Sequence, residues 1–306
     1  MRKALPFLCF LVTLSLSAQV SLTSNYLPEL GDTLFVSFAD SAATVDLLST
    51  GGPQVWDFND LTTVGSAERV VEELDLSTFD AAFAEADFKI RISNLSTNYY
   101  TRTDGELVFV GNIGTSPLLP GISLVTPFTP PFVDRRAPLA YLDQFSSINS
   151  VVVPVAVDSL PQVILDAGGP ILASYDSIRL NTEIDRVDVV DAYGTLTVDG
   201  VTYDVIREKR TEIRDVKVEA KLGFFPWADV TFIVLQALPD LGDVLEEQDT
   251  LITYNFYNDD YVEPIATVVT TGDGESVIDI NFRTNRATSS VDDGFISANH
   301  HYRSCR

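Results

Sequence analysis

Histidine and cysteine are almost absent from the 306-residue sequence. It contains only His300 and His301 near one end, and Cys9 and Cys305 near the two ends. A Ser-His-Asp or Cys-His arrangement would need a terminal histidine to fold back onto a nucleophile. Zinc sites draw on the same two residue types. We therefore expect neither chemistry and assign no catalytic residue.

Basic residues are also scarce, because 20 Lys and Arg stand against 44 Asp and Glu and give a formal net charge of −24. Affinity for nucleic acids depends on clustered Lys and Arg. The same imbalance disfavours docking on an anionic membrane surface. The sequence also lacks the GxxxxGK and GxGxxG loops that cradle phosphates. Nucleic-acid binding and an organic cofactor are therefore not expected.

A long apolar run lies at the amino end, where residues 1–18 read MRKALPFLCFLVTLSLSA. Arg2 and Lys3 precede the run, and the small residues Ser17 and Ala18 follow it. This order is typical of a secretory signal peptide. The run is shorter than the roughly 20 apolar residues that span a bilayer. We expect cleavage near Ala18, no later membrane span, and a secreted, periplasmic or cell-envelope protein.

Apolar and polar residues alternate along four segments, at residues 88–93, 216–222, 252–256 and 278–282. Alternation places one face in a core and the other in water, as in antiparallel strands. Helical spacing is confined to residues 77–86, where we expect one short surface helix or turn. The pattern predicts an all-β domain over residues 19–282, sandwich-like or built on a curved antiparallel sheet. Residues 283–306 form the tail.

Asp-Gly dipeptides at 104–105 and 199–200 predict two hairpins, because Asp-Gly suits the positive φ angles of a type I′ turn. The second turn would pair Val198 with Val201 in the flanking strands. In the strand before it, apolar residues change parity, which predicts a β-bulge near residues 185–186 or a strand crossing between two sheets.

Prolines and glycines gather in residues 111–138, which predicts a long connection. It would join residues 19–110 and 139–282 as two halves of one architecture or, alternatively, as two subdomains.

Two motifs resemble those of a known family. Residues 51–58 read GGPQVWDF, and residues 191–196 read DAYGTL, followed by YDVIR at 203–207. They are similar to motifs of an uncharacterised secreted Bacteroidota protein family whose members carry Trp-Asp-Phe near the amino end. The resemblance implies an exported, β-rich protein. Members often end in a type IX secretion sorting domain, which the residues after Phe282 do not match.

The residues of both motifs also suggest packing roles. Trp56 and Phe58 are two residues apart and share one strand face, so we expect them in a core, with ligand stacking by Trp56 as the alternative. Arg207 is expected to pair with Asp191 or Asp188.

Acidic loops supply candidate calcium ligands, namely Asp259, Asp260, Asp273 and Glu275. Their spacing is not that of an EF-hand, so solvated acids that keep the protein soluble are the alternative.

Aromatic residues supply the candidate ligand contacts. If exposed, Tyr99 and Tyr100 would stack on a sugar or a partner; if buried, they belong to the core. Phe224 and Phe225 are expected in the core, whereas Trp227 after a proline is the better candidate for a loop contact.

These features predict an exported, non-catalytic β-protein that binds a partner protein or a polysaccharide at the cell envelope. One alternative is a glycan hydrolase, which needs two carboxylates about 5–10 Å apart. The other is a purely structural envelope component, which predicts an exposed apolar or strand-edge surface and no pocket.

Overall fold

The computed structural model describes residues 21–40, 46–75, 79–116, 119–159, 162, 165–166, 169, 174–237, 249–274 and 276–284. The expected signal peptide, both cysteines, both histidines and Glu275 lie outside these residues. Within them, nearly all regular structure is strand, which confirms the all-β prediction. No helix in this described part is long and apolar enough to cross a membrane.

The described strands are, in chain order, β1 (Ser21–Leu22), β2 (Thr33–Ala39), β3 (Gly51–Asp57), β4 (Thr63–Glu72), β5 (Phe88–Ser93), β6 (Ser96–Arg102), β7 (Glu106–Ser116), β8 (Leu119–Arg136), β9 (Leu139–Ala140), β10 (Gln144–Ala156), β11 (Ser177–Val198), β12 (Val201–Lys221), β13 (Ala228–Asp229), β14 (Asp249–Tyr257), β15 (Ala266–Thr271) and β16 (Val277–Arg283). The described helices are short, namely the 3-10 helices η1 (Ser24–Tyr26), η2 (Asp80–Phe83) and η3 (Val157–Ser159) and the α-helix α2 (Thr231–Ala237). The helix or turn expected at residues 77–86 is η2, whose Phe83 is buried.

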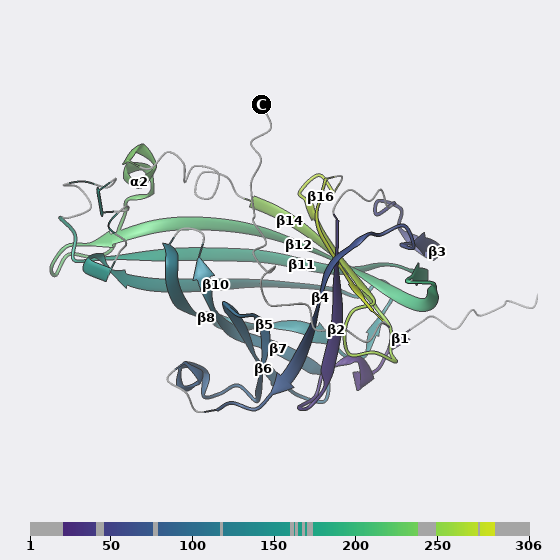
Figure 1. The fold of residues 1–306 in the computed structure, drawn as a ribbon. Coiled ribbons are helices and arrows are strands. Elements are labelled where there is room, and N and C mark those ends of the chain that lie inside the picture. Colours follow the sequence, from purple (N-terminus) through teal and green to yellow (C-terminus); the bar gives the residue numbers. More distant parts are fainter. Residues whose placement is uncertain are drawn as a thin grey trace, which may run out of the picture.

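Most of these strands belong to one sheet that closes on itself. Its hydrogen-bonded order is β12-β14-β15-β16-β2-β4-β5-β6-β7-β8-β10-β11. The last strand, β11, also pairs with the first, β12, which completes the ring. The expected curved antiparallel sheet therefore bends far enough to join its own edge. Figure 1 shows the long strands β10, β11, β12 and β14 on one side and β5 to β8 on the other. The short strand β3 adds in parallel beside β11.

The hairpin at Asp199 and Gly200 has the predicted register, with Val198 opposite Val201. Asp199 has φ of 50° and Gly200 has φ of 75°, as the expected turn requires. The Asp-Gly pair at 104–105 also lies in a hairpin, between β6 and β7. That turn has no positive φ angle, so it is not of the predicted type.

The predicted bulge at residues 185–186 is wrong. β11 pairs with β12 without interruption from Ser177 to Val190, and the register shifts between Val190 and Ala192. The parity changes because Arg186, a charged residue, occupies an inward position and is only 2% exposed. Because of the bulge at Asp191, even-numbered residues face the interior before it and the outside after it. Val190 packs in the interior core, and Ala192 packs in a core outside the sheet.

The long connection predicted for residues 111–138 is largely strand, because β7 extends to Ser116 and β8 runs from Leu119 to Arg136. Proline has no N–H to donate and is tolerated in strands where that bond is not needed. β8 pairs with β10 through only two residue pairs, Thr129 with Ser150 and Phe128 with Val151. The prolines therefore lie in a strand that leaves most of one edge without ladder bonds.

A second weak junction lies between β4 and β5, where only Val71 pairs with Ile90 and Glu72 with Lys89. We call these two junctions the seams. They attach the four-stranded unit β5 to β8 to the rest of the closed sheet.

The apolar cores lie on both sides of the sheet. The interior core takes residues from strands all round the ring, such as Leu34, Ile90, Phe109, Ile206 and Tyr257. Outside the sheet, the segment that includes β3 covers a core on β11, β12 and β14 to β16. The segment around η2 covers a smaller core on β6 and β7. The closed sheet therefore has apolar cores on both its inner and its outer face.

Candidate functional site

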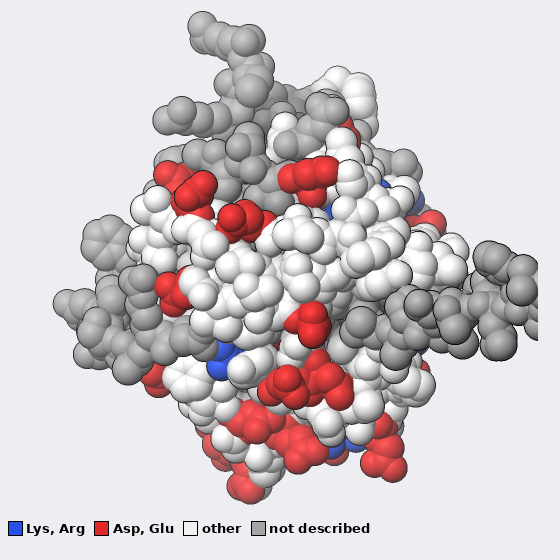
Figure 2. Space-filling view, turned by 90° about the vertical axis from the view of Figure 1, so that its right-hand side faces the viewer, with Lys and Arg blue, Asp and Glu red and all other residues white. Residues whose placement is uncertain are grey.

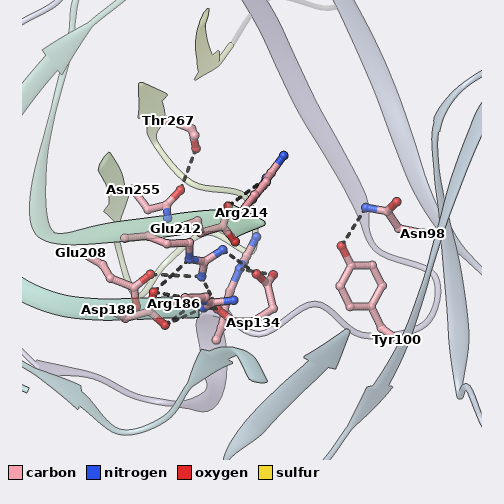
Figure 3. A network of polar contacts seen from close by, with 12 residues as sticks. Asn98, Tyr100, Asp134, Arg186, Asp188, Glu208, Glu212, Arg214, Asn255 and Thr267 are labelled. Carbon is pink, nitrogen blue, oxygen red and sulfur yellow. Dashed lines mark hydrogen bonds and ion pairs between the residues drawn. The ribbon is translucent and has the colours of Figure 1, made fainter. Parts of the chain in front are cut away.

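Charged side chains from β8, β11 and β12 meet on the interior face of the sheet (Figure 3). Arg210 lies 2.9 Å from Asp134 and 3.1 Å from Asp188. Arg186 lies 2.6 Å from Asp188, and Arg210 also lies 3.2 Å from Glu208. Each of these carboxylates is therefore matched by a guanidinium, as buried charges require.

The cluster perturbs its own acids in opposite directions. Burial raises the pKa of Glu208, and the neighbouring Asp188 adds to this against the effect of Arg210. Burial alone would raise the pKa of Asp134, but Arg210 and Arg135 outweigh it and hold that pKa below its usual value. Removing one partner of a buried pair leaves an uncompensated charge. We therefore assign this network a structural role.

The two motifs that carry the family resemblance contact each other around Arg207. Its guanidinium donates to Asp191 at 2.8 and 2.9 Å and to the carbonyls of Leu47 and Ser49 at 3.0 and 2.8 Å. It also lies 5.4 Å from the ring centroid of Trp56. The expected partnership with Asp191 is confirmed, whereas Asp188 belongs to the interior network.

Packing explains the other motif positions. Trp56 is 3% and Phe58 is 2% exposed, so both are core residues, as expected. A Cβ atom at Gly194 would overlap the backbone of Gln54 in β3, and one at Gly52 would lie 2.6 Å from the carbonyl oxygen of Tyr193. The glycines therefore permit the close approach of β3 to β11.

A surface cavity of about 290 Å³ lies beside the seam between β4 and β5. The ladder between these two strands has only two residue pairs, and the segment around η2 covers the outer face of β6 and β7. The walls come from the end of β4, the β5–β6 hairpin, the start of η2 and single residues of β7 and β8. The cavity is therefore bounded by the short β4–β5 ladder, the β5–β6 hairpin and the start of η2.

Buried charges form the floor of this cavity. Asp80 is 3% exposed, and its carboxylate accepts hydrogen bonds from Tyr99 Oη at 2.7 Å, Lys89 Nζ at 2.8 Å and the backbone N–H of Asp75 at 2.7 Å. Burial alone would lower the pKa of Lys89, but its hydrogen bonds to Asp80 and Asp75 raise it. Burial, and then the bond to Asp80, raise the pKa of Tyr99. The lysine therefore stays charged and the phenol stays protonated near neutral pH.

The cavity wall presents groups of a different kind. Glu72 and Arg91 face each other at 4.0 Å with 39% and 62% of their side chains exposed. Phe79 and Leu95, at 51% and 61% exposure, add apolar surface to the lining. Further polar groups come from the hairpin and β8, namely Ser93, Asn94, Ser96, Thr97 and Ser123. The arrangement offers both hydrogen bonding and apolar contact to a small polar ligand.

The tyrosines proposed from the sequence are buried. Tyr99 is 2% and Tyr100 is 8% exposed, so neither forms an exposed stacking platform. Tyr99 stacks on Phe83 with ring centroids 4.3 Å apart, and its hydroxyl group reaches the floor of the cavity. It therefore supports the cavity from below.

The aromatic run after β12 corrects one expectation, the one for its two phenylalanines. Phe224 and Phe225, expected in the core, are 91% and 55% exposed and stack on each other. Trp227 is half-buried, with the guanidinium of Arg179 4.5 Å from its ring centroid. The residues after β12 form a short turn, and the apolar core nearby is filled instead by residues such as Val230 of the following segment.

Two of the candidate calcium ligands, Asp259 and Asp273, have protein partners for their carboxylates. Asp259 accepts hydrogen bonds from the backbone and hydroxyl group of Thr23, and Asp273 accepts one from Thr271. The backbone N–H of Asp260 donates to Asn258. Among the described residues, no group of three or more His, Cys, Asp or Glu side chains is placed to hold a metal ion.

Sequence reasoning did not identify the cavity wall. Glu72, Phe79 and Arg91 come from three separate segments, and only the folded sheet brings them together. One signal was available: Arg91 is an outward residue of the alternating segment 88–93. Comparisons with protein-family models, curated proteins and solved structures found no match. The resemblance to secreted Bacteroidota proteins therefore stays a prediction.

Proposed function

We propose that the chain is an exported binding protein that holds a saccharide in the cavity beside β5 and β6. The observation that carries this proposal is the lining itself, which joins exposed apolar side chains to a wall of hydroxyl, amide and charged groups. Ligand sites commonly combine apolar contact with a few placed polar groups. Export rests on the leader-like residues 1–18.

The hydrogen bonds of Asp80, on the floor of the cavity, favour binding over catalysis. Glu72 and Asp80 both line the cavity, which makes a two-carboxylate hydrolase the second candidate. Both oxygens of Asp80 are, however, engaged by Tyr99, Lys89 and the Asp75 backbone. A general acid or nucleophile must be able to reach the substrate. Asp80 is therefore better suited to hold η2 against β5 and β6.

Isothermal titration with a panel of oligosaccharides tests the proposal, using Phe79→Ala as the cavity variant. Fully burying a Phe side chain is worth about 1.5–3 kcal/mol, and a ligand can cover only the exposed 51% of Phe79, so affinity should fall by roughly 3- to 12-fold. Phe232→Ala is the matched control, because this 70% exposed residue lies on α2 and not in the cavity lining.

The proposal is wrong if the parent and Phe232→Ala bind no oligosaccharide, and also if Phe79→Ala binds as tightly as the parent. Release of reducing ends from the panel, abolished by Asp80→Asn, would favour the hydrolase instead. Failure to bind any oligosaccharide would leave the structural-component alternative.

A further inference from the structure

We infer that the cavity recognises two neighbouring hydroxyl groups of a neutral sugar, with Glu72 accepting a hydrogen bond from one and Arg91 donating to the other. This inference rests on the proposed function and names the ligand class of the same site. Two charged and partly exposed side chains, Glu72 and Arg91, lie in the cavity wall.

Glu72 and Arg91 differ from the charged residues of the floor. Asp80 and Lys89 are buried and bonded to each other at 2.8 Å. The guanidinium of Arg91 is 4.0 Å from the Glu72 carboxylate, which is too far for a hydrogen bond. Both side chains are more than one-third exposed. The wall therefore holds one strong acceptor and one strong donor beside each other.

A pair of adjacent hydroxyl groups complements this arrangement. Each hydroxyl group both donates and accepts, whereas a carboxylate only accepts and a guanidinium only donates. One ligand hydroxyl group can donate to Glu72 while its neighbour accepts from Arg91. Hydrogen bonds to charged groups contribute more than neutral ones. An apolar ligand would instead leave both charged groups without partners as it displaced their water.

Charge selects a neutral sugar over an acidic or an amino sugar. Because Glu72 and Arg91 are 4.0 Å apart, a carboxylate that reaches Arg91 also meets Glu72, and an ammonium group that reaches Glu72 also meets Arg91. A charged sugar therefore gains attraction from one side chain and repulsion from the other, whereas a pair of neutral hydroxyl groups is repelled by neither. The whole chain also carries a formal charge of −24, which repels anionic glycans at long range. Figure 2 shows one face of the molecule on which acidic side chains are widespread and basic ones are few.

Size and lining restrict the ligand further. At about 290 Å³, the cavity is just below the roughly 300–1,000 Å³ typical of ligand pockets. It therefore has room for one or two sugar units, such as the end of a glycan chain. Phe79 and Leu95 would cover the apolar face of the ring, and Asn94 would bond a further hydroxyl group.

Titration calorimetry with neutral disaccharides of glucose, galactose and mannose, and with glucuronic acid and glucosamine, tests the inference. We expect Glu72→Gln and Arg91→Gln each to weaken binding of the best neutral disaccharide by about 10- to 100-fold. Glu73→Gln is the control, because it removes the same charge one residue away and outside the cavity lining. Affinity for the neutral sugar should not change between low and high salt.

Two results separate the inference from the function on which it rests. If Phe79→Ala loses binding while Glu72→Gln and Arg91→Gln bind like the parent, the saccharide site stands and the two-hydroxyl recognition is wrong. Tighter binding of glucuronic acid or glucosamine than of every neutral sugar would also overturn the inference. If no sugar in the panel binds to the unmodified protein, the proposed function fails as well.

Discussion

Replacing Arg207 by methionine should destabilise the protein by about 3–5 kcal/mol, the usual cost of removing one partner of a buried ion pair. Arg207 is 0% exposed, and its side chain makes four hydrogen bonds, to Asp191, Leu47 and Ser49. Methionine keeps much of the side-chain volume, so the loss reports on the polar contacts more than on a cavity.

The magnitude follows from what remains after the substitution. The Asp191 side chain is 9% exposed and would lose the guanidinium that now lies 2.8 Å away. The two carbonyl groups of the segment before β3 would also lose their donor, and a buried unsatisfied polar group costs about 1–3 kcal/mol. Strand β3 and Trp56 should detach most readily, because Arg207 joins them to β12.

Urea unfolding followed by far-ultraviolet circular dichroism and by tryptophan fluorescence measures the effect. Arg91→Met is the control and should change stability by less than about 0.5 kcal/mol, since its side chain is 62% exposed. A double-mutant cycle with Asp191→Asn should show a coupling of at least about 1 kcal/mol. A loss below about 1 kcal/mol for Arg207→Met, or additive single effects, would refute this account of the contact.

Three further predictions concern other parts of the framework. Gly194→Ala should destabilise the protein by more than about 2 kcal/mol in urea unfolding, because its Cβ would overlap the backbone of Gln54; unchanged stability would contradict the close approach. Phe224→Ser should leave the free energy of unfolding within about 0.5 kcal/mol of the parent, because the side chain is 91% exposed; a large loss would mean that Phe224 is buried. The third prediction is that Asp134→Asn and Glu208→Gln change the stability of the protein, relative to the parent, in opposite directions as the pH rises from 4 to 8. The lowered pKa of Asp134 contributes stability above the usual Asp pKa and loses it as pH falls through the lowered value, so Asp134→Asn should lose most at neutral pH. The raised pKa of Glu208 makes its ionised form costly as pH rises above the usual Glu pKa, so Glu208→Gln should gain stability relative to the parent toward neutral pH. Parallel pH profiles for the two variants would contradict the assignment.

Local features of the fold were predictable because they depend on neighbouring residues. The positive φ angles at Asp199 and Gly200 fix a two-residue turn, and the turn then sets Val198 opposite Val201. Alternation likewise located β5, β12, β14 and β16, because each has one face in a core. Such short-range rules do not predict which strands pair when they are far apart in the sequence. The pairing of β16 with β2, which closes the sheet between strands far apart in the sequence, is therefore beyond their reach.

Inward-facing charges explain the main errors. The alternation rule expects apolar residues inside, yet Arg186 of β11 faces the inside of the ring, so the change of parity there predicts a bulge where the ladder is continuous. The prolines of β8 predict a loop, because their tolerance in a strand depends on an edge with few ladder bonds, which only the assembled sheet reveals. The candidate site was missed because Glu72, Phe79 and Arg91 converge only in three dimensions.

The bulge at Asp191 places residues of the same sequence parity on opposite faces of β11. Before it, even-numbered residues face the inside of the ring, and after it they face the layer beneath β3. Val190 pairs with Glu208 and Ala192 with Arg207, so Asp191 is the extra residue of the strand. Deleting it would leave Leu196 and Val198 on their present face but would remove the carboxylate that pairs with Arg207. A one-residue insertion or deletion elsewhere between Ala192 and Val198 would instead turn part of that segment to the opposite face.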